Sequence, residues 1–302
     1  MPTGATLSVW KAAGTNPQEP WNMSNMKSIL SSVVALLMVL TSGCISLSLG
    51  GDTGGGMQSP ASAWGRPDLL IIAHRGQSGV FPENTMLAFQ GALRTGADFY
   101  ELDAHLTKDG VPVVLHDGDL KRTAGLEGKK VQDLTLAEVK ELDAGSWKGS
   151  QFAGEKIPTL REALAWSKDK IDVMVELKSG NPGLAEKAVA IIQEVGMVKN
   201  VVLASFDESY IKTAKALEPS MRTLGLQSKM VEWEREDDSF ADILGCAVSE
   251  EITEEMLRAV HMRGMQVWVW TVDKPEDMER LAKMGVDGII SNYPERLTGR
   301  AE

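Results

Sequence analysis

Ionisable side chains gather at the ends of short apolar runs in this 302-residue sequence. Apolar runs become buried on folding, so charges at their ends are costly unless a metal or a charged ligand compensates them. Carboxylates bind a divalent cation, histidines transfer protons, and cations bind phosphate, so such a set suits the hydrolysis of a phosphate ester. The residues concerned are His74, Arg75, Glu101, Asp103, His116, Glu176 and Lys178.

The acidic residues form a candidate metal site. Glu101 and Asp103 stand two residues apart in an apolar run, so their side chains point to one face of a strand. Two neighbouring carboxylates repel each other unless a cation lies between them. Glu176 adds a third carboxylate from a neighbouring strand, and oxygen ligands suit one divalent cation, Mg²⁺ or Ca²⁺. A network of structural salt bridges is the alternative interpretation.

Two of the four histidines are candidate catalytic residues. His74 follows the first strand directly, and His116 ends a hairpin arm that a tight turn brings back beside Asp103. Two histidines that flank a metal-bound phosphate can share the proton transfers. Either one alone would be interpreted as a hydrogen-bonded core residue. His105 shares a strand face with Glu101 and is expected to line the pocket without taking part in catalysis.

Three further residues are candidates for substrate binding. Arg75 and Lys178 are cations at strand ends, and they can bind phosphate, balance the carboxylates, or do both. Trp270 ends the seventh strand and can stack on the carbon skeleton of a substrate, although a core position is nearly as consistent with the pattern.

The positions of these residues depend on an alternation of strand and helix patterns that starts at Leu69. With Val111–His116 folded back as a hairpin arm, eight strands remain, which is the number in a TIM (β/α)8 barrel. A doubly wound open sheet is the alternative. A barrel requires its functional residues at the C-terminal strand ends, where the residues above lie. The predicted strands are Leu69–Ala73, Phe99–Thr107, Ile171–Leu177, Val201–Ser205, Arg222–Leu226, Ile243–Val248, Val267–Thr271 and Gly288–Ser291. The predicted helices are Asn84–Thr95, Leu160–Ser167, Leu184–Glu194, Ser209–Leu217, Glu254–Arg263 and Pro275–Lys283.

The composition is that of a globular protein, with 43% hydrophobic and 24% charged residues. The net charge of −11 argues against non-specific binding of nucleic acid, which requires a basic surface. The two cysteines, Cys44 and Cys246, fit neither a disulfide framework nor a zinc motif.

The N-terminal part has the pattern of a secretory signal. Ser28–Gly51 carries no charged side chain, Lys27 precedes it, and Ile29–Leu40 is almost entirely apolar. Leu40–Cys44 resembles a lipoprotein cleavage site, so Cys44 is expected to become lipidated and to anchor the protein to a membrane outside the cytoplasm. An uncleaved membrane helix and cleaved soluble secretion are the alternatives.

The sequence therefore divides into three parts. Residues 1–44 form an N-terminal extension with a signal segment, and residues 45–66 form a glycine- and serine-rich flexible tether. Residues 67–302 form the folded domain.

Several motifs occur together in a fixed order. His74-Arg75 is followed by Glu101-x-Asp103 and then by His116-Asp117. Over about 69–297 the chain thereby resembles the glycerophosphodiester phosphodiesterase family. Further matching stretches are 82–85, 106–110, 157–160, 176–178, 270–272 and 285–290.

The resemblance implies a TIM barrel with a small insertion, about 118–156, after the second barrel strand. It implies hydrolysis of glycerophosphodiesters to glycerol 3-phosphate and an alcohol. It assigns Glu101, Asp103 and Glu176 to the metal, His74 and His116 to acid–base catalysis, and Arg75 and Lys178 to phosphate.

The rival functions are a phospholipase D-like enzyme for lysophospholipids or sphingolipids, and a non-catalytic lipoprotein that binds phosphoglycerol. One departure from the family pattern is Asp273, which stands where the family often has asparagine.

Overall fold

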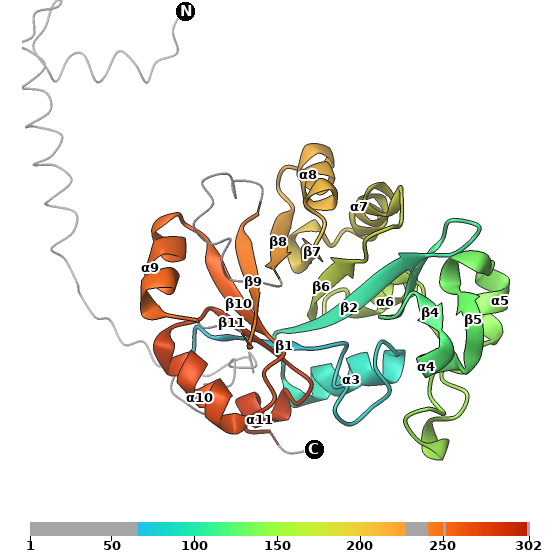
Figure 1. Cartoon of the computed structure of the whole chain (residues 1–302), viewed down its shortest axis with the longest axis horizontal. Helices are drawn as coiled ribbons and strands as arrows, with labels where there is room; N and C mark the ends of the chain where they lie inside the picture. The colour runs from blue at the N-terminus through green and yellow to red at the C-terminus, as the bar shows by residue number, and fades with distance from the viewer. Residues whose placement is uncertain (1–65, 228–240, 250–251, 301–302) are drawn as a thin grey trace, which may run out of the picture. The chain divides into compact units, whose positions relative to one another are not determined.

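The computed structural model describes residues 66–227, 241–249 and 252–300 (Figure 1). The expected signal segment, Cys44 and the tether up to residue 65 lie outside the described residues. Among the residues that are described, no helix combines the length and the apolar character needed to cross a bilayer.

Eight parallel strands close into a barrel, which confirms the predicted TIM-barrel fold and excludes the open sheet. The strand order around the sheet is β1-β11-β10-β9-β8-β7-β6-β2, and β1 also pairs with β2, so the ring is complete. The strands are β1 (Leu70–Ala73), β2 (Phe99–Leu106), β6 (Asp172–Leu177), β7 (Val201–Ser205), β8 (Arg222–Gln227), β9 (Ile243–Ala247), β10 (Gln266–Trp270) and β11 (Gly288–Ser291).

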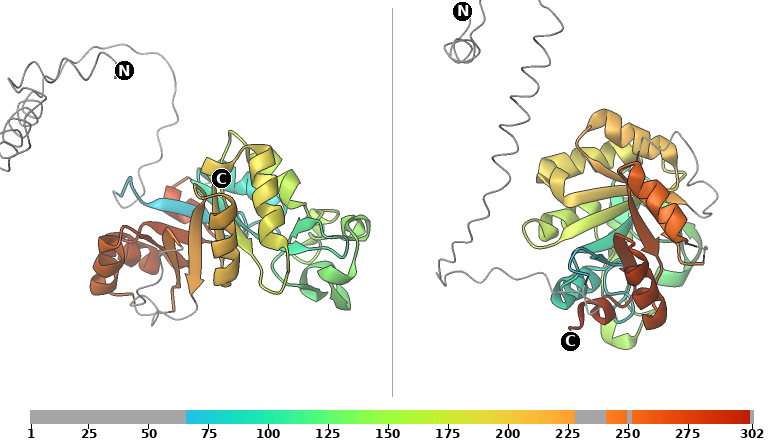
Figure 2. Two further views of the ribbon diagram at one scale, coloured as in Figure 1. Left: turned by 90° about the horizontal axis from the view of Figure 1, so that it is seen from above. Right: turned by 90° about the vertical axis from the view of Figure 1, so that its left-hand side faces the viewer.

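Helices surround this barrel on its outer side (Figure 2). They are α3 (Met86–Thr95), α6 (Leu160–Ser167), α7 (Leu184–Val195), α8 (Glu208–Leu217), α9 (Glu254–Met262), α10 (Pro275–Met284) and α11 (Glu295–Thr298). Most bounds agree with the predicted ones to within one residue. Helix α3 starts two residues later than predicted, because Asn84 has a left-handed backbone (φ 58°) and Thr85 caps the helix by accepting from the amide of Ala88.

Large apolar side chains fill the inside of the barrel below the strand ends. Met174, Leu224 and Trp268 are among the fully buried residues of this inner cluster. Two glycines make room for them: a Cβ at Gly288 would lie 2.7 Å from the ring of Trp268, and one at Gly245 would lie 2.6 Å from Leu224. The tight packing leaves the upper end of the barrel as the place where polar groups gather.

The hairpin arm and the insertion follow β2, as predicted. Strand β3 (Pro112–Val114) pairs antiparallel with β2. The insertion contains β4 (Asp119–Leu120), α4 (Lys121–Ala124), β5 (Leu126–Lys130) and α5 (Leu136–Glu141), together with 3-10 turns at Val131–Asp133 and Ser150–Phe152. It has a small apolar core of its own, formed by Val113, Leu115, Leu120, Val131, Val139, Ala144 and Ile157. The insertion lies beside β2 and α6 in Figure 1.

Candidate active site

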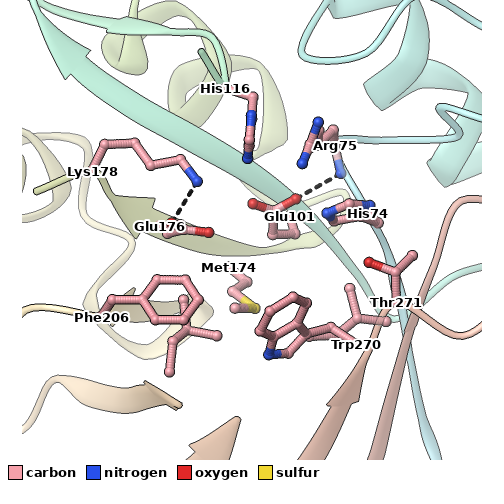
Figure 3. Close-up of a pocket in the computed structure, with 12 residues that line it drawn as sticks. His74, Arg75, Glu101, His116, Met174, Glu176, Lys178, Phe206, Trp270 and Thr271 are labelled. Atoms are coloured by element: carbon pink, nitrogen blue, oxygen red, sulfur yellow. Dashed lines mark hydrogen bonds and ion pairs between the residues drawn. The ribbon is translucent and has the colours of Figure 1, made fainter. Parts of the chain in front are cut away.

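A pocket opens at the C-terminal ends of the barrel strands, where the sequence places the chemistry (Figure 3). It is lined by His74, Arg75, Glu101, His116, Met174, Glu176, Lys178, Phe206, Leu226, Trp270, Thr271 and Ile290. Seven of the eight predicted site residues with described positions are in this set. The eighth, Asp103, is fully buried directly beside it.

The three acidic residues converge, since ligand oxygens of Glu101, Asp103 and Glu176 all lie within 4.8 Å of one another. The parallel register of β2 and β6 places Asp103 directly opposite Glu176. One oxygen of Glu101, Oε2, accepts from the backbone amide of Arg75 at 2.7 Å. The other, Oε1, is buried with no hydrogen-bond partner among the described residues. An unpaired buried carboxylate oxygen is costly, and a cation would satisfy it.

The pKa values of these three carboxyl groups are shifted in different directions. Burial and the two neighbouring carboxylates raise the pKa of Glu101 well above its usual range, and burial and Asp103 raise the pKa of Glu176. Burial would also raise the pKa of Asp103, but Lys178 and Arg75 hold it well below its usual value. Lys178 and Arg75 therefore favour the charged form of Asp103 over those of the other two carboxyl groups.

Two cations and one amide hold Asp103. Lys178 Nζ lies 2.8 Å from Asp103 Oδ1 and 2.5 Å from Glu176 Oε1, so this lysine bridges two of the carboxylates. Arg75 Nε forms an ion pair with Asp103 Oδ2 at 3.4 Å. Asn84 donates from Nδ2 to Oδ2 at 2.8 Å and accepts from the Asp103 amide, which uses the left-handed turn before α3.

His74 is oriented by residues from the far end of the chain. Its Nδ1 lies 2.8 Å from Asn292 Oδ1, and Asn292 donates from Nδ2 to Asp273 Oδ2 at 2.7 Å. A carboxylate can only accept, so the amide of Asn292 is fixed with its oxygen toward His74. Nδ1 of His74 must then be the donor, which leaves Nε2 without a proton. Burial, helped by the charge of Arg75, lowers the pKa of His74 to about 4.

His116 has a different kind of partner. Its Nδ1 lies 2.7 Å from the carboxylate oxygen Oδ1 of Asp117, and Oδ2 of Asp117 accepts from Arg122. A carboxylate stabilises positive charge on a ring that it contacts. The two histidines thus face one pocket with unequal support: an amide oxygen behind His74 and a carboxylate behind His116.

His105 does not line the pocket, contrary to the expectation from its strand face. The residue is 6% exposed, and Asn181 donates to Nδ1 of its ring at 3.2 Å. Nε2 of His105 therefore donates to the backbone oxygen of His116 at 3.1 Å. The backbone of His116 therefore lies against this ring, and His105 supports the segment that carries His116.

An apolar wall faces the charged groups, as Figure 3 shows. Trp270 lines the pocket and packs edge-to-face on Phe206 with ring centroids 5.7 Å apart, whereas Trp268 is the core tryptophan. Met174 belongs to the same wall. It stands two positions before Glu176 on β6, so the alternation of side chains along the strand could have identified it from the sequence.

Comparisons with known proteins agree with this geometry. A family model described as the glycerophosphoryl diester phosphodiesterase family matches residues 74–296. A glycerophosphodiester phosphodiesterase from Caldanaerobacter subterraneus is 43% identical over 235 residues, which cover 76% of this chain and 96% of that protein. A glycerophosphodiester phosphodiesterase from Bacillus subtilis is 33% identical over 289 residues, which cover 87% of this chain and 95% of that protein. Among solved structures, an Oleispira antarctica phosphodiesterase in complex with the product sn-glycerol-3-phosphate has a TM-score of 0.69 and 31% identity, and the match covers 76% of this chain and 95% of that one.

The contacts of His74 predict which ring nitrogen carries the proton in solution and at what pH the ring becomes charged. In the metal-free protein, the ring should carry its proton on Nδ1 and should remain neutral on acidification until the pH approaches 4, because burial and Arg75 oppose the charged form. Nitrogen-15 NMR of the histidine side chains measures both the tautomer and the titration. A ring protonated on Nε2, or one that titrates near pH 6.5, would contradict this reading of the contacts.

Proposed function

The chain belongs to the glycerophosphoryl diester phosphodiesterase family, and from this premise we propose that it hydrolyses glycerophosphodiesters by paired-histidine catalysis at a divalent-cation site. The products are glycerol 3-phosphate and an alcohol. The observation that carries the proposal is the convergence of three buried carboxylates and two differently supported imidazoles on a single pocket.

The cation would be held by Glu101, Asp103 and Glu176. The donor set fits a hard divalent ion, Mg²⁺ or Ca²⁺, because all three ligands are carboxylate oxygens and one of them is buried without another partner. When bound, such an ion supplies Lewis-acid stabilisation of the charge on the phosphate oxygens. Arg75 and Lys178 line the same pocket and are placed to bind those oxygens as well.

His74 is proposed as the general base. Its Nδ1 proton is held by Asn292, so its free Nε2 can take the proton of the attacking hydroxyl. If this hydroxyl belongs to water, glycerol 3-phosphate forms directly; if it belongs to the glycerol moiety, a cyclic phosphate forms first and water then opens it. The low pKa of the ring keeps it in the neutral, proton-accepting form at physiological pH.

His116 is proposed as the general acid. Asp117 accepts from Nδ1 and orients the ring, so that a proton on Nε2 can be donated to the departing alkoxide. The apolar wall of Met174, Phe206 and Trp270 lies opposite the charged groups and suits the carbon skeleton of a substrate whose phosphate faces the cations. This wall gives the pocket two chemically different sides, as an ester of phosphate and glycerol requires.

Removal of divalent cations should abolish turnover, and Mg²⁺ or Ca²⁺ should restore it. Cation affinity should increase with pH, because Glu101 and Glu176 have raised pKa values and must lose their protons before they can bind. Calorimetric titrations between about pH 5.5 and 8 measure this. Glu101→Gln should remove binding, whereas Glu155→Gln is a control, because burial also raises the pKa of Glu155 but this residue lies in the insertion. Full turnover after exhaustive chelation would contradict the proposal.

The two histidines should be separable by the leaving group. His74→Ala and His116→Ala should each reduce kcat on glycerophosphocholine by about 10²- to 10⁴-fold with the fold intact. A diester with a nitrophenol leaving group needs no proton on departure, so it should restore most of the activity of His116→Ala and none of that of His74→Ala. Equal responses of the two variants would refute the assignment of roles, and circular dichroism verifies the fold.

We also propose, from the sequence pattern of the N-terminal part, that the enzyme acts outside the cytoplasm and is anchored through a lipid on Cys44. A lipoprotein of this kind carries more than one acyl chain, since one chain binds a membrane weakly. Cys44→Ser should therefore move activity from the membrane fraction to the soluble fraction and should abolish incorporation of labelled fatty acid. Retention of the variant in the membrane would instead indicate a membrane helix.

A further inference from the structure

We propose that Arg122, which the insertion supplies, is a positioning residue that holds both His116 and Arg75 in place. This inference rests on the proposed function, because it names what keeps the proposed acid and the proposed phosphate-binding cation in position. Arg122 does not line the pocket and would not touch the substrate. Its guanidinium acts through two carboxylates, those of Asp117 and Glu83.

All three nitrogens of the guanidinium are engaged with carboxylate oxygens. Nε donates to Asp117 Oδ2 at 2.6 Å, while Nη1 and Nη2 donate to the two oxygens of Glu83 at 2.8 and 2.7 Å. The contact with Glu83 is bidentate, which is the strongest geometry for such a pair. Hydrogen bonding to Glu83 in particular raises the pKa of Arg122 far above its usual value, so the charge is permanent.

Each of the two carboxylates also holds a residue of the pocket. Asp117 accepts through Oδ1 from His116 Nδ1 at 2.7 Å, and Glu83 accepts through Oε1 from Arg75 Nη1 at 2.9 Å. The five side chains therefore form a continuous chain of contacts from His116 to Arg75, which both lie on the charged side of the pocket. Arg122 stands at its centre, where the loss of one side chain would weaken the support of both His116 and Arg75.

The insertion fixes Arg122 itself. The ring of Trp147 lies 5.4 Å from the guanidinium carbon, and Trp147 donates from Nε1 to the backbone oxygen of Ala144 at 2.8 Å. The next residue, Lys148, donates to the backbone oxygen of Ser78, in the loop between His74 and α3, at 2.7 Å. The insertion thus contacts the loop between His74 and α3 through Lys148, through Phe152, whose ring packs edge-to-face on Phe81, and through Arg122. Arg122 is the contact that continues to Arg75 and His116.

Lysine could not replace this arginine. The ammonium group of a lysine is a single point of charge, whereas the contacts here require donors to three oxygens on two carboxylates at fixed angles. Without the guanidinium, the carboxylates of Glu83 and Asp117 would also repel each other across the space that it leaves. Arg122→Met and Arg122→Lys should therefore both loosen His116 and Arg75.

The kinetic test uses the full chain with a divalent cation and glycerophosphocholine. Arg122→Met should reduce kcat by about 10- to 100-fold, the size of effect that outer-shell partners have. It should also raise KM several-fold, because Arg75 binds phosphate. Arg122→Lys should recover only a small part of either loss. Lys121→Met is the matched control and should leave kcat and KM unchanged: Lys121 lies in the same short helix, and within the described part of the chain its ammonium group pairs with Glu127 and with no site residue.

A double-variant cycle tests the chain of contacts. If Arg122 acts on His116 through Asp117, then Asp117→Asn should reduce kcat much less in the Arg122→Met background than in the wild type. Additive losses would contradict the inference. So would a lower kcat that merely follows the fraction of folded protein at an unchanged KM, and so would wild-type values in Arg122→Lys.

A measurement that does not depend on catalytic activity tests this inference separately from the proposed function. In the metal-free protein, Arg122→Met should shift or broaden the ring signals of His116 and leave those of His261, which pairs with Asp287 on another part of the barrel, unchanged. If the wild type shows no metal-dependent hydrolysis, the proposed function fails while the NMR comparison still decides the role of Arg122. Unchanged His116 signals would overturn the positioning role even if the enzyme is active.

Discussion

The desolvation of three carboxylates at the top of a packed barrel is the constraint on which the rest of this structure depends. Glu101, Asp103 and Glu176 cannot all be charged at such close range unless positive charge surrounds them. Arg75 and Lys178 supply part of that charge and thereby fix Asp103 as an anion. The raised pKa values of Glu101 and Glu176 show that these two cations do not fully compensate the negative charge, and a divalent cation would supply the rest.

The two histidines differ because different groups contact their Nδ1 atoms, and not because of their own positions. An amide oxygen fixes a tautomer without adding charge, whereas a carboxylate favours the protonated ring. Asn292 and Asp117 are therefore as informative about chemistry as the imidazoles that they contact. Asp273 belongs to the same arrangement: its carboxylate orients Asn292, which gives a physical role to the position where the chain departs from the family pattern.

The amino-acid sequence was sufficient for the barrel and for the principal site residues because both depend on short-range patterns. Buried parallel strands appear as apolar runs, and their ends carry the charged residues that the closed sheet brings together. The residues that hold the site residues in place were harder to predict from the sequence. Arg122 and Glu83 stand 39 residues apart and Asn292 and His74 stand 218 apart, so their pairing depends on tertiary packing. The expectation that His105 lines the pocket was wrong, because the alternation of side chains along a strand gives the face on which a residue lies but not which other segment packs against it.

The closure of the barrel between β1 and β11 has a consequence for the timing of synthesis. His74 is translated well before the side chains that orient its ring, because Asn292, which contacts the ring, follows it by 218 residues and Asp273 in turn orients Asn292. The nascent chain therefore carries an imidazole whose proton is not yet assigned to either nitrogen. The orientation of this ring therefore has to wait until β11 has been synthesised and has paired with β1.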